Sequence, residues 1–156
     1  MGPDDAVHRL RGAIDAEVLF GLREEFHRQA PFATATVDDV VNPTVLTVAL
    51  TASLRPAADT TGRFDVQWTT EGDYKLHYTE PDLDFRWGHH PHGGAYDVPD
   101  DAHFHPPPNA SRDPADVEAS CFSVHRPRLV VRGVLTNWRA AYQGGLDELN
   151  RPAYSG

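Results

Sequence analysis

The sequence has 156 residues, of which 40% are hydrophobic, so it is long enough to bury one core and too short for two comfortable domains. Its formal net charge is −9. The chain has 16 aspartates but 7 glutamates, and 13 arginines but a single lysine, Lys75. This composition resembles that of proteins from salt-loving archaea. At molar salt the screening length falls to about 3 Å, so this charge does not exclude nucleic acid. We expect one domain over residues 1–156, loose from about residue 150.

Export and membrane insertion are not supported by the sequence. Cys121 is the only cysteine, so no disulfide can form within the chain. Nothing near Met1 has the pattern of a signal peptide, and the longest apolar runs fall short of the about 20 residues that a membrane helix needs. The sequence therefore predicts a soluble, cytoplasmic protein.

An amphipathic helix is predicted over residues 4–29. Apolar side chains recur there every three or four positions, from Val7 to Phe26, with charged residues between them. Gly21 is the place where a break would occur if there is one. Pro31 ends the pattern, because proline lacks a backbone donor and disfavours helix at the preceding residue.

After Pro31 the hydrophobic period changes to two, which predicts strands. Val, Thr, Phe, Trp and Tyr alternate with polar residues, and turn residues separate the segments, which are residues 32–37, 44–54, 63–70, 73–79 and 83–87. The short link at residues 70–73 indicates a hairpin. The middle of the chain is therefore predicted to be an antiparallel meander.

The last third returns to a helical pattern. Pro127 suits a first helical turn, apolar residues from Val130 to Tyr142 share one face, and Gly144-Gly145 ends the helix. No acidic residue occurs between Ala119 and Leu146, and the arginines there form a predicted nucleic-acid-binding patch, Arg126, Arg128, Arg132 and Arg139. The predicted fold is α+β: an antiparallel β-meander sheet flanked by an N-terminal and a C-terminal helix.

Five of the nine histidines lie in residues 86–108, a stretch too rich in glycine and proline for a helix. On a strand His103 and His105 share one side, and His90 and His92 do so if that piece is extended. If residues 83–88 and 102–105 are neighbouring strands, the two histidine pairs meet beside Arg86 at one exposed spot.

Three roles for these histidines remain open. Converging imidazoles can bind zinc or a similar divalent metal, with His90, His92, His103 and His105 as ligands, but no Cys or Glu has a matching spacing, and we do not favour a metal. They can instead give and take protons beside a phosphate held by Arg86. Alternatively they hydrogen-bond to the carbonyls of an irregular loop and only hold it together.

Other residues with chemical potential are predicted to be structural. His8, His27 and His125 are expected on solvated helix faces, and His77 on a strand surface. Trp68, Trp87 and Trp138 are expected in the core, and Cys121 is expected to be a small buried side chain.

The order of these features resembles the TumE family of toxin–antitoxin proteins. The resemblance covers residues 63–142: a strand "LDFRW", then "HHPHGG", a short acidic loop, "HFHPP", a strand around Glu118 and a closing helix with "VLTNW". The matching positions are Arg86, Trp87, His89, His90, His92, His103 and His105, with Glu118 and Ser120 downstream. Gly88 departs from the family's usual Asp, and Phe104 from a basic residue.

The resemblance implies a growth-inhibiting toxin whose partner is a DNA-binding antitoxin of the winged-helix or helix-turn-helix type. From the residues themselves we expect a metal-independent ribonuclease, without a cofactor and with RNA as a partner. In this hypothesis His90 and His105 are the acid/base pair, Arg86 binds phosphate, and His92 and His103 orient the pair. The alternative is a non-enzymatic module that binds the antitoxin. A homo-oligomer is compatible with either.

Overall fold

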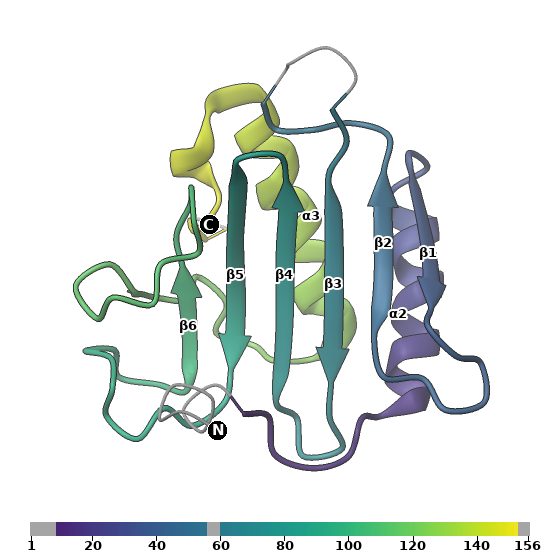
Figure 1. Cartoon of the computed structure of the whole chain (residues 1–156), viewed down its shortest axis with the longest axis horizontal. Coiled ribbons are helices and arrows are strands. Elements are labelled where there is room, and N and C mark those ends of the chain that lie inside the picture. Colours follow the sequence, from purple (N-terminus) through teal and green to yellow (C-terminus); the bar gives the residue numbers. More distant parts are fainter. Residues whose placement is uncertain (1–8, 56–59, 153–156) are drawn as a thin grey trace.

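The computed structural model describes residues 9–55 and 60–152, and its centre is a seven-stranded sheet (Figure 1). The strands are β1 (Ala33–Val37), β2 (Leu46–Leu50), β3 (Arg63–Trp68), β4 (Tyr74–Glu80), β5 (Leu83–His89), β6 (Ala102–His105) and β7 (Glu118–Ala119). Each strand pairs with the next one in the chain, and every pair is antiparallel. The predicted meander is therefore confirmed.

Two long helices lie together on one face of the sheet. Figure 1 shows α2 (Ala16–Gln29) behind β1 and β2, and α3 (Pro127–Gly144) behind β3 and β4; the short η1 (Leu146–Glu148) follows. The predicted α+β class is confirmed, with both helices on the same face. No helix in the described part of the chain is long and apolar enough to cross a membrane.

The first helix begins later than its hydrophobic period predicts. Asp15 is its N-cap and accepts a hydrogen bond from the Val18 N–H at 3.1 Å. Just before it, Ile14 forms an isolated bridge with Thr69 at the end of β3, which holds this segment extended. The prediction that helix runs through residues 9–15 is therefore wrong, and residues 4–8, including His8, lie outside the described residues. The helix continues through Gly21 without a break.

The core lies between the sheet and the two helices. Alternate side chains of the central strands are buried there, among them Phe64, Tyr78 and Phe85. Burying one such ring stabilises the fold by about 1.5–3 kcal/mol. The three tryptophans lie in this core as predicted: Trp68, Trp87 and Trp138.

A buried acid joins the two helices. The Glu25 carboxylate of α2 is fully buried and accepts hydrogen bonds from Arg132 of α3 at 2.7 Å and from Arg28 at 2.8 Å. Burial alone would raise the pKa of Glu25, but the hydrogen bonds from Arg132 and Gln29 bring it below its ordinary value.

The end of the described chain is anchored up to Asn150. The Asn150 side chain accepts a hydrogen bond from the Cys121 N–H at 2.8 Å and donates one to the Ala119 carbonyl at 2.9 Å. These bonds tie Asn150 to the segment that follows β6, and residues 153–156, most of the predicted loose tail, lie outside the described part of the chain.

The face of the sheet opposite the helices carries polar residues in cross-strand rows. One row runs through Asp65, His77, Arg86 and His105, and the next through Gln67, Lys75, Gly88 and His103. His77 lies on this surface as predicted, 3.1 Å from Asp84. This polar face holds the candidate site.

Candidate active site

Arg86 is placed by the alternation of β5. Its neighbours Phe85 and Trp87 point into the core, so Arg86 points to the opposite face of the sheet. Its cross-strand partner on β6 is His105, and two residues along β5 Gly88 faces His103. The predicted pairing of these two strands, on which the site depends, is confirmed.

Four imidazoles gather next to Arg86, with His103 in the middle. The ring centroid of His103 lies 4.7 Å from that of His90, 5.0 Å from that of His105 and 5.9 Å from that of His92. We call these four residues the imidazole cluster. Neighbouring rings meet edge to face, with interplanar angles of 86–89°.

Backbone carbonyls fix the tautomers of the cluster. Nδ1 lies 3.0 Å from the Pro91 carbonyl in His90, 2.8 Å from the Asp101 carbonyl in His103 and 2.8 Å from the Ser111 carbonyl in His105. A carbonyl only accepts, so each Nδ1 carries the proton and the lone pair is on Nε2. His92 is held the other way, because its Nε2 lies 3.1 Å from the Asp100 carbonyl.

Gly88 makes room for the cluster. A Cβ at this position would lie 2.9 Å from Nε2 of His103 and 3.5 Å from Nε2 of His90. Both nitrogens therefore converge on one point above β5. An alanine at this position would force the His103 ring to move. The Asp that the family resemblance leads us to expect here would occupy the same space as that ring.

The cluster is buried, which corrects the expectation of an exposed spot. His90, His103 and His105 have no exposed surface, and His92 is 9% exposed. The segment over residues 90–101 links β5 to β6, and its buried Tyr96 packs on His103 and His105 at centroid distances of 5.3 and 5.5 Å. The bond between His103 and the Asp101 carbonyl ties the end of this segment to β6.

Burial keeps the central imidazoles neutral. It lowers the pKa of His103 to about 2, with a further contribution from neighbouring His90. It also lowers the pKa of His90, although the bond to the Pro91 carbonyl opposes this shift. In the closed form these rings accept protons poorly.

Arg86 is a buried cation that forms no ion pair within residues 9–55 and 60–152. It is 8% exposed, and its Nε and Nη2 have no hydrogen-bond partner among the residues that the structure describes. Burial, and after it the charge of Arg112, lowers the pKa of Arg86 to about 10, so the guanidinium remains charged at neutral pH. An unpaired charge in such a place destabilises the folded chain.

Lys75 and Arg112 are parts of this site that the sequence pattern did not reveal. Half-buried Lys75 of β4 pairs with Gly88 of β5, two residues along the strand from Arg86, and burial, together with the charges of Arg86 and Arg112, lowers its pKa to about 8. Arg112 is exposed. The one available signal was that Lys75 is the only lysine in an arginine-rich chain.

The pKa of Lys75 predicts that alkali stabilises the fold. Between its folded pKa of about 8 and its ordinary value of 10.5, the unfolded chain binds one more proton than the folded chain. The free energy of unfolding therefore rises with pH in this window. Urea titrations between about pH 7.5 and pH 9 should show the rise, and Lys75→Met should remove it. Above pH 9 the burial-raised pKa of Cys121 opposes the trend.

The described residues do not include a set of side chains arranged to bind a metal ion. Among residues 9–55 and 60–152, no group of three or more His, Cys, Asp or Glu side chains is arranged to hold a metal ion.

The other described histidines lie outside the cluster. His89 belongs to the family-like motif, but its ring stacks on Tyr74 and lies 4.3 Å from the His125 ring, measured between centroids. His125 precedes α3, is half-buried and shares a hydrogen bond with the Tyr74 hydroxyl at 2.8 Å, so its expected place on a solvated helix face is wrong. His27 is exposed on α2 and accepts a hydrogen bond from the Ala35 N–H at 3.0 Å.

The predicted basic patch does not border the cluster. Its helix α3 covers the face of the sheet opposite Arg86. Arg132 is tied to Glu25, and Arg139 donates to the Gln29 carbonyl. Arg126 and Arg128 remain exposed.

The fold and site together define a small α+β protein with a cationic, histidine-rich site on one face of its sheet. Residues 22–137, which include the whole sheet, Arg86 and the imidazole cluster, match the family described as Toxin TumE. The chain belongs to this family: it is the toxin of a toxin–antitoxin pair, and an antitoxin is its partner. No curated protein and no solved structure matches it.

Proposed function

We propose that this toxin is a ribonuclease that cleaves RNA without a metal ion, with Arg86 and the imidazole cluster as its active site. The observation that carries the proposal is the charged, buried Arg86 guanidinium, two of whose nitrogens have no partner among the described residues. Buried charges are normally paired. An anion that binds there would supply the missing partner.

Three cations support a phosphate as that anion. Lys75, Arg86 and Arg112 lie close enough for their charges to act on one another, although the chain as a whole has a net charge of −9. A guanidinium matches two oxygens of a phosphate, and an ammonium adds a third contact. An RNA phosphate bound here would remove the mutual repulsion.

His90 and His105 then act as base and acid. One imidazole takes the proton from a ribose 2′-hydroxyl, and the 2′-oxygen attacks the adjacent phosphorus. The bond from phosphorus to the 5′-oxygen breaks, and the other imidazole, in its protonated form, gives that oxygen a proton. The products are a 2′,3′-cyclic phosphate, which water opens to a 3′-phosphate, and a free 5′-hydroxyl.

The remaining histidines and Arg86 support this exchange. The low pKa of His103 suits an orienting residue that stays neutral, and His92 is assigned the same role. Bound phosphate raises the pKa of His90, because an anion favours the protonated ring. Arg86 stabilises the charge that develops on the phosphorane.

Substrate entry requires the covering segment to move. The segment over residues 90–101 contains Gly93 and Gly94, both with positive φ, and the cluster is closed while Tyr96 packs on it. We propose that RNA binding opens this segment. The RNA phosphate then replaces the backbone carbonyls as the hydrogen-bond partner of the site.

The double variant His90→Ala and His105→Ala tests the proposal. Purified protein should lose RNA cleavage in the presence of chelator by about 100-fold or more, because both proton-transfer groups are gone. Circular dichroism and thermal unfolding check the fold, and wild-type products should carry a 2′,3′-cyclic phosphate. His27→Gln, which keeps an acceptor for Ala35, is the matched control and should cleave normally.

A non-enzymatic toxin that acts by binding a target is the second candidate. The observation that favours it is the closed cluster, in which each ring holds a backbone carbonyl. Growth inhibition that survives in the folded double variant would support this candidate and exclude catalysis by the cluster.

A further inference from the structure

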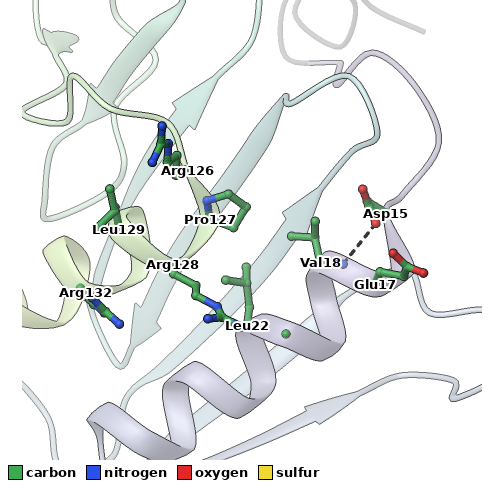
Figure 2. A pocket seen from close by; sticks show the side chains of 10 residues that line it. Asp15, Glu17, Val18, Leu22, Arg126, Pro127, Arg128, Leu129 and Arg132 are labelled. Atoms are coloured by element: carbon green, nitrogen blue, oxygen red, sulfur yellow. Dashed lines mark hydrogen bonds between the residues drawn. The ribbon is translucent and has the colours of Figure 1, made fainter.

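A groove with a volume of about 600 Å³ separates the first turns of α2 and α3 (Figure 2). It lies on the helical side of the sheet, away from the imidazole cluster. Val18 and Leu22 form its apolar wall on α2, and Leu129 of α3, which is 44% exposed, lies opposite. Leu22 is almost fully buried and Val18 is half-buried, so Leu129 supplies most of the exposed apolar surface named here.

Gly21 lines the groove, and the fold does not require a glycine there. Nothing lies within 4 Å of the place that its Cβ would occupy, and its φ lies outside the left-handed region. Glycine inside a helix costs about 1 kcal/mol relative to alanine. No close contact or backbone conformation in the described chain explains why a glycine occupies this position. The space beside the helix backbone at Gly21 is therefore open to a binding partner.

The charges beside the groove indicate what fits it. The first turn of α3 has no acidic residue, and its N-cap Arg126 makes no side-chain capping bond. Arg126 and Arg128 are exposed, and neither forms an ion pair within the part of the chain that the structure describes. On the other wall the Asp15 carboxylate is already engaged as the cap of α2 (Figure 2). The exposed Glu17 also lies on that wall, so the positive charge is confined to the α3 side of the groove.

We propose that this groove binds an acidic amphipathic segment of the antitoxin. Its apolar side chains fill the space between Val18, Leu22 and Leu129, and its backbone packs against Gly21. Its carboxylates pair with Arg126 and Arg128 and interact favourably with the N-terminal end of α3. The proposal rests on the toxin–antitoxin family and not on the ribonuclease mechanism, because the groove and the cluster lie on opposite faces of the sheet.

Gly21→Trp in the full chain tests the proposal, because the indole would occupy the groove. The probe is the antitoxin encoded beside the toxin gene, with affinity measured by calorimetry. We expect binding to weaken about 30-fold or more and growth inhibition to persist but no longer be neutralised by the antitoxin. Gly144→Trp, at the far end of α3, is the matched control and should bind normally; its Cβ meets only Glu148, at 3.5 Å. Normal binding by folded Gly21→Trp would overturn the proposal.

Charge reversal gives an independent readout should the tryptophan disturb the fold. Arg126→Glu combined with Arg128→Glu should weaken antitoxin binding and reduce its salt dependence, whereas Arg23→Glu on α2 should not. Hydrogen exchange of the wild-type complex should slow at residues 16–22 and 127–132. Protection confined to residues 90–101 would overturn the proposal, as would a toxin dimer that Gly21→Trp dissociates. Loss of cleavage in the histidine variants with normal antitoxin binding would instead refute only the proposed chemistry.

Discussion

Arg86→Met is expected to abolish RNA cleavage while raising the midpoint of thermal unfolding. The variant loses the group that binds phosphate, and loss of such an electrostatic contact typically lowers kcat by about 10²–10³-fold. It also removes a buried charge with two nitrogens that have no partner among the described residues. Replacing a buried charge with an apolar side chain of similar volume is often neutral or stabilises a protein by about 1–4 kcal/mol. Activity and stability should therefore change in opposite directions.

Two further variants make this result specific. Arg63→Met removes an exposed arginine that pairs with Asp65 on the same face, and it should leave cleavage intact and change stability by less than about 0.5 kcal/mol. Arg86→Lys keeps the charge with fewer donors and should retain part of the activity. A fall in the unfolding midpoint of Arg86→Met would show that the guanidinium stabilises the fold, and unchanged cleavage would exclude Arg86 from the site.

The regular part of this site was predictable because strand alternation is a short-range rule. The order of apolar and polar residues placed Arg86 opposite the core, and the spacing of His103 and His105 placed both on the same face. The pairing of β5 with β6 then followed from the short distance between them in the chain. These steps need only the period of a strand and the preference for antiparallel neighbours.

The burial of the cluster was not predictable in this way. The segment over residues 90–101 has no hydrophobic period, so nothing in its pattern showed that it contributes a side chain that packs on the histidines. Tyr96 appears in the sequence as an isolated aromatic residue in a loop. Its contacts with His103 and His105, and the carbonyl bonds of the rings, depend on the path of the backbone.

The arginine patch illustrates a different limit. A run of like charges along the chain says which residues share a helix, but not which face of the sheet that helix covers. The structure places α3 behind the sheet, where Arg132 and Arg139 hold α2. Lys75, by contrast, has no charged neighbours in its strand and reaches the site only because β4 pairs with β5. Tertiary pairing therefore decided which cations lie beside the histidines.

Acid is expected to destabilise the toxin well before its carboxylates are protonated. Burial lowers the pKa of His103 to about 2, and it also lowers those of His90 and His125. Below pH 6.5 the unfolded chain therefore binds more protons at these residues than the folded chain does. The free energy of unfolding therefore falls as pH decreases, by up to about 1.4 kcal/mol per pH unit for each histidine.

Urea titrations between about pH 6.5 and pH 5 isolate this effect. At lower pH the carboxyls of Asp73 and Glu25, whose pKa values are lowered, add a loss of their own. His103→Phe keeps the ring volume without the titrating group and should reduce the slope by about one proton. An acid slope in His103→Phe equal to that of the wild type would mean that the His103 ring is accessible to protons in the folded chain. The covering segment would then be open much of the time, and the cluster would be available to substrate without a prior rearrangement.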